Sequence, residues 1–359
     1  MRWMVFLVAS LGLTTSIPWG ASARDSSVNH GFRSSALESW TNVVSSGALP
    51  PGRRDAGVAY DSQGDRLVVI GGGGGGSATW LLNLAGLPTW TSVAEASPPS
   101  VSGDDRAVYD PVNNRIILVT SSMQAWALDL ANPTAWGLLA AGSSPPPRSF
   151  YAATYDALRN RLLIFGGGPY TGLFNDVWAL PLSGTSQIWT QIVGAGAAPA
   201  PRWGPVAVYD SARDRLIITS GSLDGGYSVS NDVWALSLSG TPAWTQLAPS
   251  GSAPPSRMLA AAIYDPTVDR LLLYGGYAGG GALGDVWGLS LQAPVAWTQL
   301  SPAGTSPPAR WSLGAVYRSS LGQMIIFGGA VEGVLNDTWA LQIEPKSFRM
   351  NRRSPTRLT

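Results

Sequence analysis

PRSFYAATYDALRNRLLIFGGGPYTGLFNDVWALPLSGTSQIW, residues 147–189, is the stretch that decides the fold. It holds four short apolar runs rich in Val, Ile, Tyr, Phe and Trp, each bounded by Gly, Pro, Asn or Asp. Short runs of strand-favouring residues between turn-forming residues indicate antiparallel strands joined by turns. The stretch therefore predicts one four-stranded sheet.

The same unit recurs along most of the chain. Its closing tryptophan returns at intervals of 50, 46, 53, 55 and 53 residues, at Trp40, Trp90, Trp136, Trp189, Trp244 and Trp297. A repeated four-stranded sheet can bury its faces only against its neighbours, and a period of about 50 residues is typical of propeller blades. An all-β propeller is therefore expected.

The two ends of the repeat region complement each other. Residues 37–43, LESWTNV, resemble the fourth strand of a unit but have no first three strands before them. The last unit runs from Arg310 through Trp339 and stops without a fourth strand. If the N-terminal strand completes the last sheet, no sheet edge is left open at the junction. We predict a six-bladed propeller over residues 37–343, with four antiparallel strands per blade.

Each unit also carries its own turn chemistry. Asp156 ends the first strand of its unit and Arg161 begins the second, and the same pair recurs in four other units. Asp at the start of a turn accepts backbone N–H groups two or three residues on, so an Asp–Arg pair is expected across the hairpin. Gly166 and Gly167 after the second strand are expected to let the chain turn close to its neighbour. The tryptophans of the third and fourth strands are expected in the core.

Composition excludes several classes of function. The 23 Lys and Arg against 22 Asp and Glu leave no net field that would attract nucleic acid or an anionic membrane. There is no cysteine, and the single histidine, His30, lies outside every unit. Metal sites built from His or Cys, disulfides and a Ser-His-Asp triad are therefore not expected. We predict neither a metal nor a cofactor.

The two termini differ from the repeat region. Residues 1–23 combine Arg2, an apolar run too short to span a bilayer and an Ala-Ser-Ala ending, the pattern of a secretory signal peptide. We expect cleavage after Ala23 and a secreted or periplasmic protein without a transmembrane segment; an uncleaved N-terminal anchor is the alternative. Residues 24–36 are predicted to be a flexible lead-in. Residues 344–359 are predicted to be a basic disordered tail or, as an alternative, the altered end of a longer protein.

A family resemblance follows from three motifs. The diglycine after an apolar strand, the Asn175-Asp176-x-Trp178 start of the third strand and the closing Trp-Thr resemble kelch repeats over residues 37–343. The form Tyr-Asp-x4-Arg-Leu-x3-Gly-Gly is similar to that of bacterial exported kelch proteins named after the central domain of galactose oxidase. The resemblance implies a scaffold rather than that enzyme's activity, because its copper site needs histidines and a cysteine-linked tyrosine.

Candidate binding residues come from the loops that share one end of the channel. Loops between blades, and loops between second and third strands, meet at the same end because each strand reverses direction, and function tends to lie in such loops. The inter-blade loops are expected to bring six arginines to this mouth: Arg53, Arg106, Arg148, Arg202, Arg257 and Arg310. The same loops add seven aromatic residues and one acid: Phe150, Tyr151, Tyr170, Trp203, Tyr227, Tyr277, Trp311 and Glu332. Rings beside guanidinium groups suit a sugar or peptide site. The alternative is that each arginine satisfies backbone carbonyls or an acid such as Asp55 or Asp105.

Three functional hypotheses follow. The first is an exported, monomeric, non-enzymatic module that recognises a glycan or a protein through the loops at one end. The second is an enzyme acting on acidic sugars, as in the sialic-acid mutarotases and sialidases that share the six-bladed fold. It would need a Tyr–Glu pair beside three convergent arginines, with Glu332 or Glu95 as the acid-base group. The third is a structural spacer in a surface assembly, with a plugged channel and an exposed apolar patch.

Overall fold

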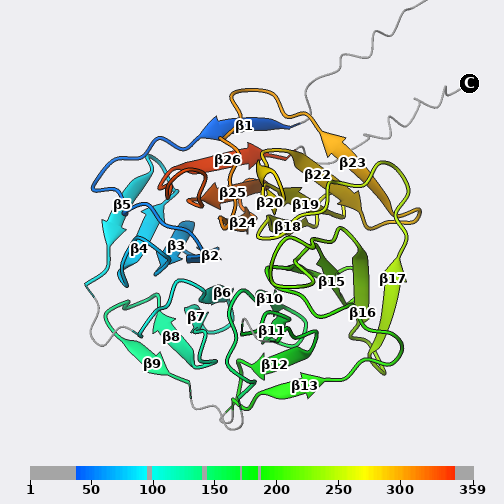
Figure 1. Cartoon of the computed structure of the whole chain (residues 1–359). Coiled ribbons are helices and arrows are strands. Elements are labelled where there is room, and N and C mark those ends of the chain that lie inside the picture. Colours follow the sequence, from blue (N-terminus) through cyan, green and yellow to red (C-terminus); the bar gives the residue numbers. More distant parts are fainter. Residues whose placement is uncertain (1–37, 95–98, 140–143, 170–171, 185–186, 344–359) are drawn as a thin grey trace, which may run out of the picture. The chain divides into compact units, whose positions relative to one another are not determined.

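The computed structural model describes residues 38–94, 99–139, 144–169, 172–184 and 187–343, which belong to one compact unit. The predicted signal peptide, lead-in and basic tail lie outside these residues. Every regular element described is a β-strand, and six four-stranded antiparallel sheets surround a central channel (Figure 1). The prediction of an all-β, six-bladed propeller is confirmed.

Blades 1 to 3 follow the chain from the innermost strand to the outermost. Blade 1 comprises β2 (Gly57–Asp61), β3 (Arg66–Ile70), β4 (Thr79–Asn83) and β5 (Thr89–Ser92). Blade 2 comprises β6 (Arg106–Asp110), β7 (Arg115–Val119), β8 (Ala125–Asp129) and β9 (Trp136–Leu138). Blade 3, the stretch quoted first, comprises β10 (Ala152–Asp156), β11 (Arg161–Phe165), β12 (Val177–Pro181) and β13 (Thr190–Ile192).

Blades 4 to 6 repeat this order with two additions. Blade 4 comprises β14 (Val206–Asp210), β15 (Arg215–Thr219), β16 (Val233–Ser237) and β17 (Ala243–Leu247). Blade 5 comprises β18 (Ala261–Asp265), β19 (Arg270–Tyr274), β22 (Val286–Ser290) and β23 (Ala296–Leu300), with a small hairpin of β20 (Tyr277–Ala278) and β21 (Gly281–Ala282) between β19 and β22. Blade 6 comprises β24 (Gly314–Arg318), β25 (Gln323–Phe327), β26 (Thr338–Gln342) and, from the N-terminal region, β1 (Ser39–Asn42).

Strand β1 closes the ring. It pairs antiparallel with β26, so that Trp40 stands opposite Leu341. The backbone N–H of Val43 extends the ladder by donating to Thr338 O at 2.9 Å. The Trp40 ring lies 5.1 Å from that of Tyr274 in blade 5, across the next seam. The spare strand near the start of the chain therefore fills the vacancy in the last blade, as predicted.

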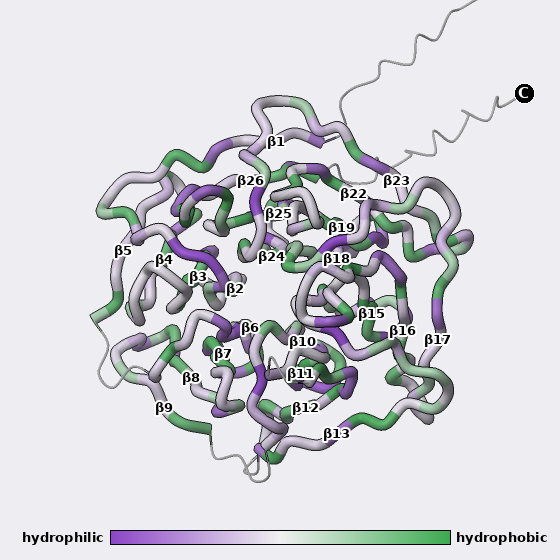
Figure 2. Tube along the Cα trace, viewed as in Figure 1, coloured by the Kyte–Doolittle hydropathy of each residue, from purple (hydrophilic) through white to green (hydrophobic). Residues whose placement is uncertain are grey.

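The core is divided among the seams between blades, because the centre of the ring is a channel. Six apolar clusters each join strands of two neighbouring blades. In Figure 2, hydrophobic segments accordingly recur around the whole ring. The predicted core role of the closing tryptophans is confirmed, since Trp244 is half-buried and the other five are buried: Trp40, Trp90, Trp136, Trp189 and Trp297.

The glycine pair that follows the second strand in blades 1, 3, 5 and 6 is required by close packing. In blade 3, Gly166 and Gly167 have φ of 68° and 73°, a region that L-residues with side chains rarely adopt. A Cβ on Gly167 would lie 2.5 Å from Ser149 O of the inter-blade loop. The second strand can therefore end against the preceding loop only if no side chain stands there, as the sequence predicts.

Candidate binding face at the channel mouth

One end of the channel, here named the loop face, carries the inter-blade loops together with the loops between second and third strands. Isolated antiparallel bridges join these loops within five blades: Arg54 to Gly73, Ser149 to Gly168, Trp203 to Ser222, Met258 to Tyr277 and Trp311 to Ala330. The expectation that both kinds of loop share one end is confirmed. Residues on the two loops are held close together by these backbone contacts.

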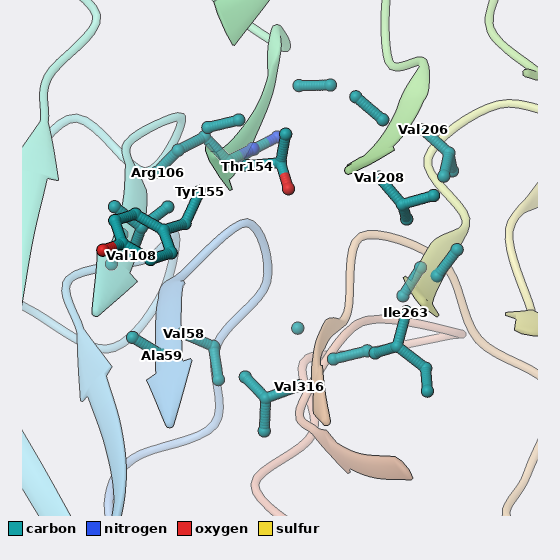
Figure 3. Close-up of a pocket in the computed structure, with 18 of the residues that line it drawn as sticks. Val58, Ala59, Arg106, Val108, Thr154, Tyr155, Val206, Val208, Ile263 and Val316 are labelled. Atoms are coloured by element: carbon teal, nitrogen blue, oxygen red, sulfur yellow. The ribbon is translucent and has the colours of Figure 1, made fainter. Parts of the chain in front are cut away.

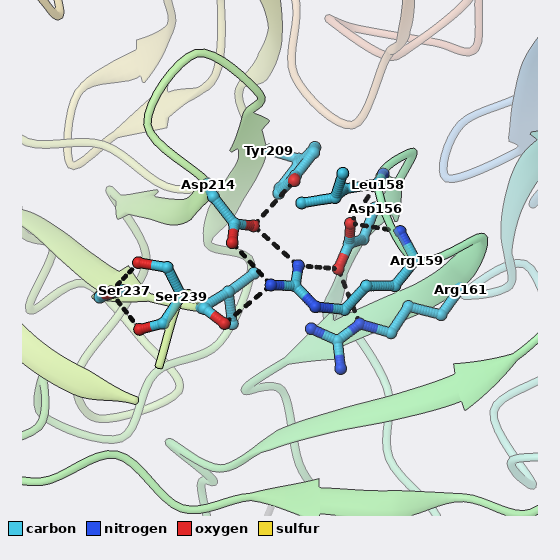
Figure 4. Close-up of polar contacts among 9 residues, drawn as sticks. Asp156, Leu158, Arg159, Arg161, Tyr209, Asp214, Ser237 and Ser239 are labelled. Carbon is cyan, nitrogen blue, oxygen red and sulfur yellow. Dashed lines mark hydrogen bonds and ion pairs between the residues drawn. The ribbon is translucent and has the colours of Figure 1, made fainter. Parts of the chain in front are cut away.

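The opposite end is held by ion pairs between the turns of neighbouring blades. Asp156 accepts the N–H groups of Leu158 and Arg159 at 3.1 and 3.2 Å and binds Arg161 Nε at 2.7 Å, which is the predicted turn chemistry. Arg159 also reaches both oxygens of Asp214 in blade 4, at 2.7 and 2.6 Å (Figure 4). Two more such pairs cross other seams: Arg213 with Asp269 and Arg318 with Asp65. These charges serve cohesion between blades.

A channel of 510 Å³ runs between the two ends and is lined by the innermost strands. Apolar side chains are frequent in its lining, with Val58, Val108, Val206, Val208, Ile263 and Val316 among them, and polar atoms line it about as much as apolar ones do (Figure 3). Two charged residues, Asp55 and Arg106, also line it. A cavity of this size, lined by apolar side chains together with a few charged and polar groups, is within the range of ligand pockets.

Five of the six predicted mouth arginines lie beneath the loop face and are only 0–2% exposed: Arg53, Arg148, Arg202, Arg257 and Arg310. Arg148 donates Nε to Pro146 O and Nη1 to Gly166 O, both at 3.1 Å. The other four repeat these two bonds, to the carbonyl two residues earlier and the carbonyl 18 residues later. Each arginine thus ties an inter-blade loop to the end of the second strand.

In blades 3 to 6 the same guanidinium also binds an aspartate that precedes the third strand. Arg257 binds both oxygens of Asp285, at 2.6 and 2.7 Å, and Trp287 Nε1 donates to Asp285 Oδ2 at 2.6 Å. Burial alone would raise the pKa of Asp285, but the hydrogen bonds from Arg257 and Trp287 outweigh it and leave that pKa below its usual value. The equivalent trios are Arg148–Asp176–Trp178, Arg202–Asp232–Trp234 and Arg310–Asp337–Trp339.

The Asp-x-Trp motif therefore has a structural role as the counter-ion of a buried arginine. The sequence left open whether the arginines bind a ligand at the channel mouth or satisfy groups of the fold. The five buried arginines do the second. Their partners are not Asp55 or Asp105, the acids that the sequence suggested, but acids and carbonyls up to 30 residues further along the chain. The reason is that the third strand of a blade starts beside the loop from which the same blade's arginine comes.

Blade 1 keeps the arginine but lacks the acid. Ala78 stands where the other blades have aspartate, and Arg53 Nη1 reaches only its carbonyl, at 3.4 Å. Burial, with no carboxylate bound to it, lowers the pKa of Arg53 to about 10. The buried Nε1 of Trp80, two residues after Ala78, has no hydrogen-bond partner in the part of the chain that the structure describes. Because blade 1 lacks the aspartate, Arg53 has no counter-ion and Trp80 Nε1 has no acceptor among the described residues.

Blade 2 departs further, because Ser102 stands at the position of the arginine. Arg106 comes four residues later, at the start of β6, and is out of register with the other five. It donates Nε to Tyr151 O and Nη1 to Asp105 O, both at 3.1 Å, and lies 5.9 Å from the Tyr151 ring. Of the six predicted arginines only Arg106 lines the channel. Tyr151 is buried and its hydroxyl donates to Val119 O at 2.7 Å, so it belongs to the core.

Five predicted aromatic residues do lie on the loops of this face, and we call them the mouth aromatics: Phe150, Trp203, Tyr227, Tyr277 and Trp311. The rings of Phe150 and Trp203 are 3.9 Å apart, and the Tyr277 ring is 6.2 Å from both Tyr227 and Trp311. The guanidinium of Arg54, from blade 1, lies 5.4 Å from the Trp311 ring. Tyr227 is 70% exposed. Sequence reasoning does not single out Arg54, although it follows the first arginine of the series directly.

The remaining predicted residues are dispersed. Glu332 is exposed in the loop between β25 and β26, whereas Tyr170 and Glu95 lie outside the described residues. The acidic-sugar hypothesis requires three convergent arginines beside a Tyr–Glu pair. The five buried arginines are bound to acids and carbonyls of the fold, so the predicted set does not supply that clamp.

A chain of backbone hydrogen bonds runs around most of the mouth. It joins the five residues that stand two positions after the buried arginines. Four of them donate the backbone N–H to the equivalent residue of the previous blade at 2.8–2.9 Å: Gly204 to Phe150, Leu259 to Gly204, Ser312 to Leu259 and Asp55 to Ser312. All five have φ between 53° and 60°. Four of them carry side chains in this left-handed region, which is uncommon. The backbone therefore holds their side chains at fixed places around the mouth.

Two neighbouring members of this chain, Asp55 and Ser312, are polar and are 6% and 5% exposed. Asp55 Oδ2 lies 3.8 Å from Arg54 Nε. Asp55 Oδ1 and Ser312 Oγ are buried and have no hydrogen-bond partner among the described residues. Burial raises the pKa of Asp55 to about 6, although the charge of Arg106 and the neighbouring Ser312 hydroxyl both act to lower it. The sequence marks Asp55 only as a counter-ion for an arginine, because nothing in it shows which side chains face the channel.

The described residues contain neither a metal-ligand cluster nor a membrane-spanning helix. They contain no group of three or more His, Cys, Asp or Glu side chains placed to hold a metal ion. No helix among them is long and apolar enough to cross a membrane.

Comparison with known proteins agrees with the fold. The chain is similar to Adagio protein 3 of Arabidopsis thaliana, with 30% identity over 195 residues, and to Adagio-like protein 1 of Oryza sativa subsp. japonica, with 30% identity over 200 residues. Each match covers 51% of this chain and 30% of the relative. Serine/threonine-protein phosphatase BSL2 of Arabidopsis thaliana is 31% identical over 159 residues, which are 44% of this chain and 15% of that protein. The chain thus spans less than a third of the length of these relatives.

A family profile identifies the repeat. The profile described as the KLHDC2/KLHL20/DRC7 Kelch-repeats domain matches residues 119–267 and 184–356, together about two thirds of the chain. The matched region contains the Arg–Asp–Trp trios of blades 3 to 6 and the β26 edge to which β1 pairs. With six such blades in one closed ring, this chain belongs to the kelch-repeat family.

Proposed function

We propose that this chain is an interaction module whose partner, a protein, binds at the loop face. Kelch propellers are typical protein-interaction modules, and this supports the class of function. The observation that carries the choice of face is the set of mouth aromatics, in which Tyr227 is 70% exposed beside Tyr277 and Trp311. Aromatic side chains give large contact areas and are enriched at the energetic centres of interfaces.

The surroundings of the mouth aromatics support the same choice. Below them the buried arginines and the backbone hydrogen bonds between blades hold the loops in place. A surface that is already ordered before it binds loses less conformational entropy on binding. At the opposite end, by contrast, the ion pairs of Arg159, Arg213 and Arg318 are engaged within the fold.

The test uses the full chain as an affinity bait in an extract of its own source, with matched variants on the two faces. Tyr227→Ala removes an exposed ring from the loop face, and Leu158→Ala removes an exposed apolar side chain, 69% exposed, from a turn at the opposite end. We expect one partner to be retained by the wild type and Leu158→Ala and depleted at least about fivefold by Tyr227→Ala. Equal capture by all three baits, or a loss confined to Leu158→Ala, would reject the loop face.

A glycan is the second candidate partner, because the same rings could cover the apolar C–H faces of a sugar. A glycan array probed with the same three proteins separates the two candidates. Binding to a glycan that Tyr227→Ala removes, without a captured protein, would replace the protein partner by a sugar. Turnover of a substrate by the purified chain would reject the non-enzymatic module altogether.

We further propose that residues 1–23 direct export, so that a monomeric mature protein meets its partner outside the cytoplasm. The support is the sequence pattern of Arg2, the short apolar run and the Ala-Ser-Ala ending. N-terminal sequencing of the protein from its native source is expected to begin at Arg24. An N-terminus at Met1 would reject cleavage, and a scattering mass of two chains would reject the monomer.

A further inference from the structure

Asp55 Oδ1 and Ser312 Oγ are buried and have no partner at ordinary hydrogen-bond distance among the described residues, although the Ser312 hydroxyl is near enough to the Asp55 carboxylate to lower its pKa. Both residues line the channel, and the N–H of Asp55 donates to Ser312 O at 2.8 Å, so the two lie side by side at the seam between blades 6 and 1. Buried polar atoms in proteins nearly always have a partner. Two neighbouring atoms without one, in the wall of a cavity, indicate a place where a ligand supplies the hydrogen bonds.

The charges around this place favour a cationic ligand. The ionised Asp55 carboxylate can only accept hydrogen bonds, and it accepts stronger ones from a charged donor than from a neutral one. Asp104 of blade 2 adds a second negative charge nearby. Of the two neighbouring cations, Arg106 donates to two backbone carbonyls, and Arg54 lies nearest to the other oxygen, Oδ2. The Ser312 hydroxyl is the other internal donor near the carboxylate, and no described donor lies within ordinary hydrogen-bond distance of Oδ1, so Oδ1 can accept from a donor outside the chain.

The donor set also separates an organic cation from a metal ion. In the stretches that the structure describes, no three acids or histidines converge, whereas a bound divalent ion normally needs several such ligands. An ammonium or guanidinium group needs fewer acceptors, and its alkyl stem needs an apolar wall. Val58 and Val316, which belong to the apolar cluster of the same seam, line the same channel.

We infer that the mouth of the channel receives a lysine or arginine side chain of the partner, whose charged end donates hydrogen bonds to Asp55 Oδ1 and Ser312 Oγ while its stem packs on Val58 and Val316. This inference rests on the proposed function, because it names the residue that the partner presents to the loop face. The mouth aromatics then contact the partner's surface around the inserted side chain.

The experiment titrates the full chain, labelled for amide NMR, with three capped amino acids. These are N-acetyl-lysine methylamide, N-acetyl-arginine methylamide and the neutral N-acetyl-norleucine methylamide. We expect saturable shifts of the amides of Asp55 and Ser312 with at least one of the two basic probes and none with norleucine. Asp55→Asn is expected to weaken that binding by about tenfold or more and Ser312→Ala by a few fold.

Asp224→Asn is the matched control, because Asp224 is an exposed acid in a loop of the same face, between β15 and β16. It removes the same charge and is expected to leave probe binding unchanged. Equal shifts with norleucine, unchanged binding to Asp55→Asn and Ser312→Ala, or an equal loss with Asp224→Asn would each overturn the inference.

The two proposals fail separately. A captured partner that is lost with Tyr227→Ala but kept at full strength by both Asp55→Asn and Ser312→Ala would overturn the basic side chain and leave the loop face standing. Basic probes that bind in an Asp55-dependent way, with no face-specific partner captured, would support the cation pocket and reject the proposed function.

Discussion

Arg257 shows at the scale of single residues how this fold uses charge. Its guanidinium is fully buried, and the energy of taking it out of water is offset by Asp285 and by two backbone carbonyls. A buried ion pair is not by itself strongly stabilising, because desolvation cancels much of the attraction. Removing one partner is costly, however, because the other charge stays buried. The role of such a pair is therefore tested by replacing one member and keeping the other.

Replacing Asp285 by Asn is expected to destabilise the fold by about 3 kcal/mol. The amide keeps the shape of the carboxylate but leaves the Arg257 charge uncompensated. Urea unfolding at neutral pH measures the change, with Asp129→Asn, an exposed acid, as the control that is expected to stay within about 0.5 kcal/mol of wild type. A loss below about 1 kcal/mol for Asp285→Asn would show that solvent reaches the guanidinium.

Asp55 is expected to make stability depend on pH in the opposite sense to a paired acid. Its pKa of about 6 in the folded chain lies above the ordinary 3.8. The stabilisation that Asp55 gives to the folded state is therefore fully present below pH 3.8 and is lost as the pH rises through about 6. Asp55→Asn, which cannot ionise and tolerates the positive φ, should therefore be more stable than wild type at pH 8 by roughly 2–3 kcal/mol. The difference should vanish near pH 4. A variant less stable than wild type at pH 8 would contradict this.

At the scale of the element, each blade consists of four short strands joined by loops that carry polar bonds of their own. Blades 3 to 6 have the complete Arg–Asp–Trp trio, blade 1 lacks the acid and blade 2 lacks both the arginine and the acid. Blade 1 is therefore the one whose buried cation lacks a counter-ion. The aspartates of blades 3 to 6 show at which position of blade 1 a carboxylate would bind the arginine.

Ala78→Asp is expected to stabilise the protein by about 1–2 kcal/mol. The new carboxylate would stand where Asp285 stands in blade 5, within reach of Arg53 and of the unpartnered Nε1 of Trp80. Thermal and urea unfolding measure the gain. The matched control is Gln124→Asp, the same position in blade 2, where Trp126 Nε1 is likewise buried without a partner among the described residues but no arginine is present, so a smaller gain is expected. A gain of equal size in both variants would mean that the ion pair is not its cause.

At the scale of the whole molecule, stability depends on ring closure. Each blade packs only on its two neighbours, through one apolar cluster per seam, so the ring has no shared centre to hold an open form together. The junction between the two ends of the repeat region is made by β1, and by Arg318, which binds Asp65 of blade 1. A substitution that weakens the packing of β1 should therefore open blade 6 before the other blades.

Trp40→Ala is expected to cost about 3–5 kcal/mol, as large-to-small changes of a buried tryptophan do. The lost ring packs at the seam of blades 5 and 6, and β1 should separate from β26 before the rest unfolds. Hydrogen exchange followed by mass spectrometry should show faster exchange in peptides that cover β26 than in those that cover β11. A uniform increase over the ring would contradict a local opening at the closure.

The sequence by itself determines the six blades, the closing strand, the Asp–Arg turns and the glycine pairs. These features are local or periodic: a turn is encoded within a few residues, and a period of about 50 residues repeats often enough to be counted. It also places the mouth aromatics on the correct loops, because strand direction alone decides which loops share an end.

Only the tertiary structure decides what those loops do with their charges. A buried arginine and an exposed one look the same in a sequence, and the acid that binds Arg148 lies 28 residues away at the start of another strand. The out-of-register Arg106 and the unpartnered Asp55 follow from packing between blades, which no single unit encodes. Burial and partner are properties of the closed ring, since both depend on which residues of neighbouring blades come together.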